Sequence, residues 1–486
     1  MKLKYLLFLI TAGVAQATLA ADVDCSTGVL VVNEDWYGHQ NSSVNHLSPD
    51  AADGEYWAYR VVQAANPGHT LGCTNQFGAV WGDKVYFVAK QAKDPGDAVT
   101  GGRLTVCDLA SMKIVAQLEN IDPSGATADG RAFVGVSATK GYVSTSNGVW
   151  VLDLTTNTVT GQVSGTENPN GSGSGSATDA GGSLYHGQCG IMVTAAGRVF
   201  VAHQSKGLLV VDPATDAVTH TLPMDDLAGV AGAGIGSIVM ARDGNLWLSV
   251  AKDISGQGTA LNMLVKLNPA TLAHEAVILD SDIYGPSNSW YAWTPDTFCA
   301  STLRNALYWT GGQSSWFVGA NVYRLDLDTM VTTRIIDFST LAGNWKVYGA
   351  SLRVDPLTDE LYMSLFHNFQ DNTYLTRRTD YMGNIIKDYS MVRNYWFPSL
   401  FLFPEASLAG MDDVAADVTA APAISLRDGS LSVTGLAGRE LCIYTLTGAR
   451  VLTTEMTATD ASIDVSHLPS GIYIARAGSS ALRFAL

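Results

Sequence analysis

The sequence predicts an all-β protein, a seven-bladed β-propeller followed by a small C-terminal β-sandwich. Three observations support this prediction. An apolar strand–turn–strand unit recurs, with corresponding strands starting near Leu30, Val85, Tyr142, Val199, Leu246, Leu307 and Leu361. Such spacing, roughly 50 to 60 residues, is typical of four-stranded propeller blades with long loops. The units share turn chemistry, and a strand at the far end could close the ring.

Composition supports an exported β protein. The 486 residues contain only 15% charged residues, and 48 glycines outnumber the 29 lysines and arginines. The net charge of −16 argues against nucleic acid or an anionic membrane surface as partner. Residues 1–20 read as a signal peptide, with Lys2 and Lys4 before an apolar stretch and Ala20 at a cleavage site. No lipoprotein box precedes Cys25, so we expect export without a lipid anchor there.

The propeller is predicted over residues 21–410. Its first copy is read as strands Val29–Asn33, Ser43–Pro49 and Tyr59–Gln63. Later copies turn through Asp or Asn, as in Asp212-Pro-Ala-Thr-Asp216 and Asn268-Pro-Ala-Thr271, where Pro presets φ and the acidic or amide side chain caps the backbone.

Ring closure is predicted from the two ends of this region. A small apolar strand precedes copies two to seven and suits the crowded centre of a propeller. The first copy has no such strand upstream, but Phe397–Phe403 could supply it. Pairing the last strand with the first copy would remove the open sheet edges. A sandwich of the same strands is the alternative.

The tail forms a separate region. Residues 411–423 read as a linker, and residues 424–486 as short strands of a β-sandwich. Leu441–Gly448 and Ile463–Tyr473, followed by a last short strand, resemble the C-terminal sorting domain of type IX secretion cargo from Bacteroidetes. This resemblance implies passage across the outer membrane, with the type IX machinery as partner. An ordinary β-sandwich is the alternative.

The first blades carry a second resemblance. Val31–Glu34, Gly38, Asn41–Val44 and Gln76–Gly78 look like the exported YncE-like propellers of Bacteroidetes. One branch of that group captures cobalamin beside a TonB-dependent outer-membrane transporter. The resemblance implies a corrinoid ligand and such a transporter as partner. That branch has a lipid anchor, which we do not expect in this chain, so the transporter partnership is the weaker implication.

A ligand site is predicted where loops share one face. The connections between the second and third strands of each blade, and between blades, lie at the same end of a propeller. The residues expected to bind a ligand there are Trp36, Tyr37, His186, His203, Gln204, Trp290, Tyr291, Trp293, Trp316, Trp345, His367 and Trp396. Clustered aromatic rings with His and Gln between them suit a large ligand bearing amides or hydroxyls, such as a corrinoid or a glycan. Packing of loops is the alternative for each ring.

Other chemistry has weaker signals. His186, His203 and His367 are far apart in sequence, and neither Asp225-Asp226 nor Asp94 with Asp97 has EF-hand spacing, so we expect no metal site and no required cofactor. The six cysteines lack CxxC spacing and read as buried thiols, and disulfides of unassigned pairing are the alternative in an exported chain. No GxSxG or HExxH motif occurs, so we expect no catalysis. A glycan-active lyase or hydrolase, or a surface protein-interaction platform, remains as the alternative.

Overall fold

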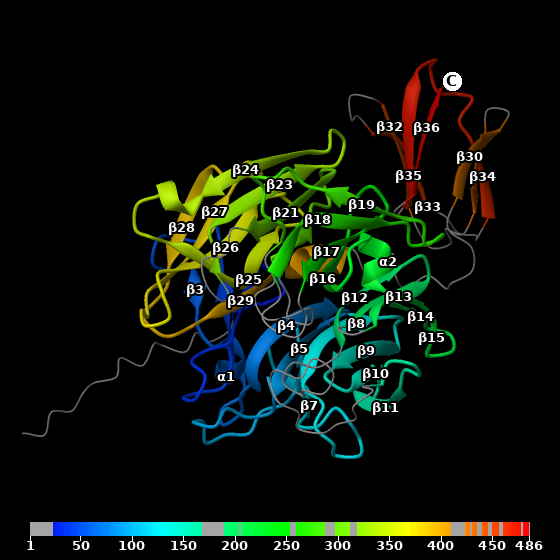
Figure 1. Cartoon of the computed structure of the whole chain (residues 1–486). Coiled ribbons are helices and arrows are strands. Elements are labelled where there is room, and N and C mark those ends of the chain that lie inside the picture. Colours follow the sequence, from blue (N-terminus) through cyan, green and yellow to red (C-terminus); the bar gives the residue numbers. More distant parts are fainter. Residues whose placement is uncertain are drawn as a thin grey trace, which may run out of the picture. The chain divides into compact units, whose positions relative to one another are not determined.

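The computed structural model describes residues 23–167, 189–203, 206–252, 259–286, 297–311 and 318–409, and, in the tail, 423–427, 430–434, 440–445, 450–455, 460–477 and 480–485. The chain divides into two compact units between Ser407 and Leu408. Antiparallel sheets make up both units, and helices are few and short (Figure 1). None of the helices in the described ranges is long and apolar enough to cross a bilayer.

The described part of the first unit contains seven sheets, and the strands of each sheet run in order from the centre of the ring outward. The first sheet runs outward through β29 (Pro398–Leu402), β1 (Val29–Asn33), β2 (Ser43–Leu47) and β3 (Trp57–Ala58). The second is β4 (Cys73–Trp81), β5 (Lys84–Gln91), β6 (Leu104–Asp108) and β7 (Ile114–Leu118). The third is β8 (Gly130–Gly135), β9 (Lys140–Thr145), β10 (Gly148–Asp153) and β11 (Thr158–Gln162).

The remaining four sheets follow the same plan. The fourth is β12 (Cys189–Ala195), β13 (Arg198–His203), β14 (Gly207–Asp212) and β15 (Ala217–Leu222). The fifth is β16 (Ala233–Met240), β17 (Leu246–Lys252), β18 (Thr259–Leu267) and β19 (His274–Ile278). The sixth is β20 (Cys299–Ala300), β21 (Ala306–Gly311), β23 (Asn321–Asp326) and β24 (Val331–Asp337). The seventh has five strands, because the short β22 (Val318–Gly319) pairs with the inner side of β25 (Lys346–Val354), which is followed by β26 (Leu361–Phe366), β27 (Tyr374–Thr379) and β28 (Ile385–Ser390).

The sheets close into a propeller-like ring. One inner strand from each sheet contacts the inner strand of the next in cyclic order: β29, β4, β8, β12, β16, β20, β25 and again β29. Apolar side chains fill the space between successive sheets, and one such cluster joins Tyr362 and Tyr389 of the seventh sheet to Val29 and Val31 of the first. The predicted closure is confirmed, because β29 pairs antiparallel with β1, with Val31 opposite Phe401. The inner edge of β1 is therefore paired where the last strand meets the first sheet.

The turns have the predicted chemistry. Asp212 Oδ1 accepts the N–H of Ala214 at 2.9 Å, and Asn268 Oδ1 accepts the N–H of Ala270 at 3.0 Å. These contacts satisfy the backbone locally and reverse the chain in a few residues. The turns that join the third and fourth strands of these sheets lie at the same end of the ring.

One predicted strand is wrong. Tyr59–Gln63 was expected to be the third strand of the first copy, but β3 ends at Ala58 and the helix α1 (Val61–Ala65) follows. Arg60 has φ 53°, and its N–H donates to Asn45 Oδ1 at 2.9 Å instead of continuing the ladder. The turn places Val61 and Val62 in the core between the first two sheets, which a continued strand would not do.

The other short helices lie in connections. They are α2 (Met224–Ala228), the 3-10 helix η1 (Phe338–Thr340) and α3 (Pro404–Ala409). The second unit has a sheet of β30 (Ala423–Arg427), β31 (Ser430–Thr434) and β34 (Asp460–Asp464), and a sheet of β33 (Arg450–Glu455), β32 (Glu440–Thr445), β35 (Ile472–Ala477) and β36 (Ser480–Ala485). Both sheets contribute to one core, for example Leu431 and Ile443. β30 was not predicted, and the predicted linker lies almost entirely outside the described residues.

Candidate functional site

The aromatic end is the end of the ring at which β1 finishes and β4 begins. Connections in an antiparallel sheet alternate between its two ends. The connections 34–42, 338–345, 367–373 and 391–397 therefore share this end, and they carry most of the described residues that were predicted to bind a ligand.

Trp36 and Tyr37 are the most exposed of these residues. Their exposed fractions are 39% and 55%. The Trp36 ring stacks on His39 with centroids 3.6 Å apart and lies 4.2 Å from the ring of Tyr395. Large exposed rings are costly in water, and the Trp36 ring is held in place by His39 and Tyr395, so a flat ligand would find a fixed surface there.

The rings continue inward from Trp36. Tyr395 lies 6.3 Å from Phe397, which in turn lies 6.2 Å from Phe369 and 5.3 Å from Tyr348. Phe369 is 37% exposed, whereas Tyr348 is buried on the innermost strand β25. A continuous aromatic series therefore runs from the surface of the aromatic end toward the centre of the ring.

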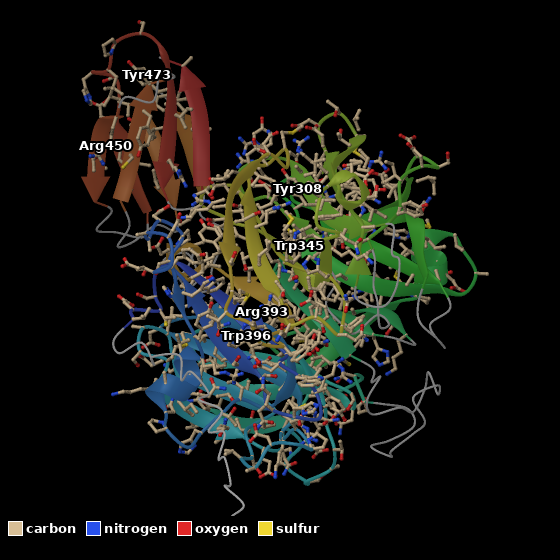
Figure 2. All side chains as sticks on the ribbon, turned by 90° about the vertical axis from the view of Figure 1, so that its left-hand side faces the viewer. Tyr308, Trp345, Arg393, Trp396, Arg450 and Tyr473 are labelled. Atoms are coloured by element: carbon tan, nitrogen blue, oxygen red, sulfur yellow. The ribbon has the colours of Figure 1, made fainter. Side chains whose placement is uncertain are left out.

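Trp345 and His367 form a second stack. Their ring centroids are 3.7 Å apart, and both side chains are partly buried. Figure 2 labels Trp345 and Trp396 on the yellow-to-orange part of the first unit. The sequence predicted that Trp345 and His367 lie at the aromatic end, and the strand topology agrees.

Trp396 and His203 are buried instead of exposed. Trp396 is 2% exposed, stacks on Tyr59 at 5.2 Å, and has the guanidinium of Arg60 5.2 Å from its ring centroid. His203 has no exposed surface, and burial lowers its pKa to about 3, so its ring is neutral at ordinary pH. Both residues reach the aromatic end, but their surroundings suit packing better than direct ligand contact. The other predicted residues lie outside the described ranges: His186, Gln204, Trp290, Tyr291, Trp293 and Trp316.

The Trp36 loop is fastened to the second sheet. Asp94 Oδ2 accepts the N–H of Gly38 at 2.8 Å, and Asp97 Oδ2 accepts the N–H of Asn41 at 2.9 Å. A Cβ on Gly96 would lie 2.2 Å from the carbonyl oxygen of Gly38, so only glycine allows this close approach. Asp94 and Asp97 thus serve as loop anchors.

Metal binding has no support in the described ranges. Within them, no group of three or more His, Cys, Asp or Glu residues could hold an ion. Asp225 Oδ1 accepts the N–H of Ala233 at 2.9 Å, which gives the Asp225-Asp226 pair a structural contact.

A polar cluster at the inner strand ends was missed by sequence reasoning. Gln76 of β4 donates from Nε2 to Glu34 Oε1 at 3.0 Å, and the Tyr348 hydroxyl also bonds Glu34. Lys90 and Arg131 are each 3% exposed. Polar residues that interrupt apolar strands near their ends could have signalled this cluster.

Burial changes the charges in this cluster. Removal from water raises the pKa of Glu34, although Gln76 and the positive charge of Lys90 oppose the change. Burial and the nearby charge of Arg131 lower the pKa of Lys90 to about 7. Perturbed groups of this kind are typical of functional sites, though structural networks also produce them.

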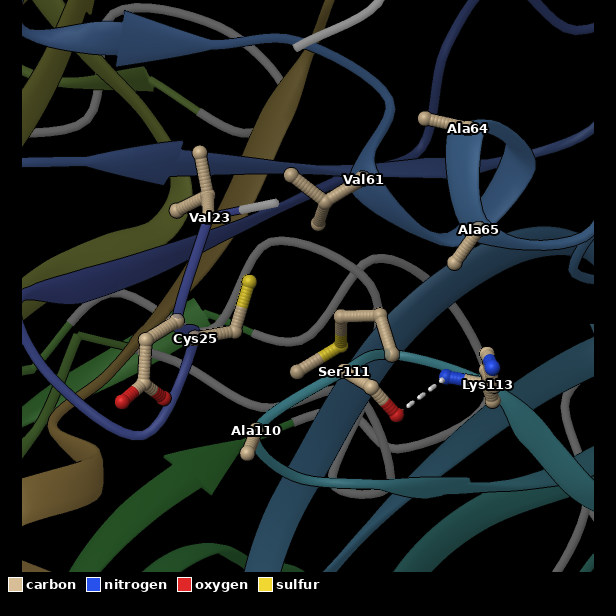
Figure 3. Close-up of a pocket in the computed structure, with 10 residues that line it drawn as sticks. Val23, Cys25, Val61, Ala64, Ala65, Ala110, Ser111 and Lys113 are labelled. Atoms are coloured by element: carbon tan, nitrogen blue, oxygen red, sulfur yellow. Dashed lines mark hydrogen bonds between the residues drawn. The ribbon is translucent and has the colours of Figure 1, made fainter. Parts of the chain in front are cut away.

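A separate pocket lies between the N-terminal segment, α1 and the β6–β7 turn (Figure 3). Its apolar wall includes Val61 and Met112, and Asp24 and Lys113 are its charged lining residues. None of the predicted site residues lines it.

Two protein families match separate regions of the chain. The family described as "Domain of unknown function (DUF5074)" matches residues 27–404. The chain belongs to this family. The DUF5074 region thus includes the whole ring and the aromatic end. The family described as "Secretion system C-terminal sorting domain" matches residues 426–483. The DUF5074 protein is therefore exported by type IX secretion to the cell surface or beyond, as the sequence predicted.

Three of the solved structures that match this chain share little sequence with it. PorZ of Porphyromonas gingivalis, described as an essential surface component of the type-IX secretion system, is 12% identical, with a TM-score of 0.44 over 92% of this chain and 63% of that one. The extracellular domain of BT4673 from B. thetaiotaomicron is 10% identical, with a TM-score of 0.47 over 88% and 59%. AztD of Citrobacter koseri is 12% identical, with a TM-score of 0.39 over 93% and 98%.

The DUF5074 chain spans about three fifths of the length of the first two structures. No curated protein sequence matches it. The YncE-like resemblance and the corrinoid ligand stay predictions.

Proposed function

We propose that this exported protein is a seven-bladed β-propeller with a β-sandwich sorting domain that captures a ligand at its aromatic end without catalysis. One observation carries the proposal. The aromatic series from exposed Trp36 through Tyr395 and Phe397 reaches Tyr348, whose hydroxyl bonds Glu34 of the polar cluster. Flat apolar surface and a few convergent polar groups are the usual composition of a small-molecule site.

A corrinoid is the first ligand to test, and a glycan the second. Both present flat or edge-on apolar surface together with many amide or hydroxyl groups, which match stacked rings and the polar cluster. A TonB-dependent outer-membrane transporter is the partner proposed for a captured corrinoid.

The test is calorimetric titration of the full exported chain with cyanocobalamin, cobinamide and an N-acetylglucosamine oligomer. We expect binding of one probe class, weakened tenfold or more in Trp36→Ala. The matched control is Leu303→Ala, which removes an exposed apolar side chain from the turn between β20 and β21, at the opposite end. Absence of binding by all three probes, or equal loss in both variants, would contradict the proposal.

A second candidate function is a glycan-active enzyme. The raised pKa of Glu34 and the lowered pKa of Lys90 bring both groups toward neutral pH, where acid–base catalysts work. Turnover of a glycan by the wild type, abolished in Glu34→Gln with binding retained, would establish this candidate in place of simple capture.

A further inference from the structure

The side-chain oxygen of Gln76 is a buried acceptor without a donor. Gln76 is 5% exposed, and its Nε2 donates to Glu34 Oε1 at 3.0 Å. The amide nitrogen faces Glu34 in this bond, so Oε1 is not engaged by the carboxyl group. Throughout the described ranges no group donates to Oε1. Buried acceptors are nearly always paired, so this one needs an explanation.

Its location points to a ligand. Gln76 lies on the innermost strand β4 at the aromatic end, and Glu34 joins it to Tyr348 at the inner end of the aromatic series. Gln76 therefore lies where the aromatic series ends, at the centre of the ring.

The charges around Gln76 favour a neutral partner. Lys90 and Arg131 supply two cationic groups, Glu34 and Asp129 supply two carboxyl groups, and Arg103 adds a third cation 3.5 Å from Asp129. Basic groups outnumber acidic ones here, so a cationic donor would be repelled, and an anionic oxygen has no hydrogen to donate. An uncharged N–H or O–H donor therefore fits the open acceptor.

We infer that Gln76 Oε1 accepts a hydrogen bond from a neutral donor of the captured ligand, either a primary carboxamide or a sugar hydroxyl. The inference rests on the proposed function and deepens it, because it assigns the polar group that the site recognises. Trp36 supplies stacking that tolerates many ligands, whereas Gln76 selects those with a correctly placed donor.

The test compares Gln76→Met with wild type in the calorimetric titrations. Methionine keeps the length of glutamine but accepts only weakly, so affinity should fall about tenfold or more. Gln117→Met is the matched control. Gln117 lies on the outer strand β7, where its Nε2 donates to Thr70 O and Thr105 Oγ1, and its variant should bind as wild type does. If Gln76→Met weakens binding of the corrinoids, the donor is a carboxamide. If it weakens binding of the oligomer alone, the donor is a sugar hydroxyl.

A second measurement needs no variant. The wild-type chain is titrated with donor-blocked probes, the heptamethyl ester of the corrinoid and the per-O-methylated oligomer. Each should bind at least about tenfold more weakly than its parent. This arm decides the question if Gln76→Met fails to fold.

The outcomes separate the two proposals. If wild type binds a probe but Gln76→Met and the blocked probe bind equally well, the role of Gln76 is overturned and ligand capture stands. If wild type binds neither probe class, both the proposed function and this inference are overturned.

Discussion

The carboxylate of Asp94 accepts the backbone N–H of Gly38 at 2.8 Å, two residues after exposed Trp36. Asp94 itself is fully buried, and its own N–H donates to Asn41 Oδ1 at 2.6 Å. The loop that displays Trp36 and Tyr37 is thus fixed by the connection that follows β5 as well as by its own turn, in which the N–H of His39 donates to Trp36 O at 3.0 Å. Rigidity of this loop reduces the entropy that a ligand would lose on binding.

Asp94→Ala should loosen this loop. A hydrogen bond to a charged group contributes about 1.5–3 kcal/mol, so the free energy of unfolding should fall by about that amount. Hydrogen exchange of residues 36–41 should accelerate. The control is Asp108→Ala, which removes a similar cap from the turn at the opposite end, where Asp108 Oδ1 accepts the N–H of Ser111 at 2.9 Å. Unchanged exchange at residues 36–41 in Asp94→Ala would contradict the anchoring role.

Leu400→Ala should weaken the ring closure. Leu400 lies on β29, is 5% exposed, and packs with Leu30 and Val85 between the first two sheets. Truncation of a buried leucine costs about 2–5 kcal/mol, because apolar contact is lost and a cavity remains. The measurement is chemical denaturation, and Leu303→Ala, whose side chain is 46% exposed, should stay within about 0.5 kcal/mol of wild type. Equal effects in the two variants would argue against a closure that depends on β29.

Asp35 should make stability depend on pH. Burial raises its pKa to about 6 from 3.8, although Arg60 lies 2.9 Å away. The folded chain holds this proton more tightly than the unfolded chain. Its stabilising contribution is therefore complete below about pH 4 and is lost as the pH rises through about 6.

Asp35→Asn should remove this dependence. Relative to the variant, wild type should lose on the order of 3 kcal/mol of unfolding free energy between about pH 4 and pH 7. Urea denaturation at a series of pH values measures the difference. Asp83→Asn, whose side chain is 82% exposed, should follow the wild-type profile. A wild-type profile parallel to that of Asp35→Asn would show that the buried carboxyl does not titrate in this range.

The cysteines should resist labelling in the folded protein. All six are free and buried, and burial raises the pKa of Cys25, Cys73 and Cys189 to about 12. Thiolate is the reactive form, so Ellman's reagent should react slowly with the native chain and with all six thiols after denaturation. Fewer than six thiols in the denatured chain would reveal disulfides.

Removal of residues 426–483 should stop export at the outer membrane. These residues match the sorting domain and form a compact unit with its own core. The truncated chain should therefore be protected from protease added to intact cells. Full-length Trp36→Ala should remain accessible, and surface exposure of the truncated chain would contradict a sorting role for the tail.

The sequence alone determined the repeating architecture and the destination of the chain. Strand periodicity and Asp or Asn turns are local signals, so turns such as those at Asp212 and Asn268 could be predicted without tertiary contacts. The pairing of β29 with β1 also followed, because a ring of repeats leaves one incomplete sheet and one spare strand. The sorting tail was recognisable from its own residues.

Tertiary structure decided the roles of individual side chains. Trp36 and Trp396 look alike in sequence, yet one is 39% exposed and the other is covered by Tyr59 and Arg60. Val61 and Val62 fit a strand or a helix equally well, and the core between two sheets selected the helix. Glu34, Gln76 and Tyr348 meet only because closure of the ring brings distant strand ends together. Burial and such long-range contacts depend on the whole fold, so no local pattern encodes them.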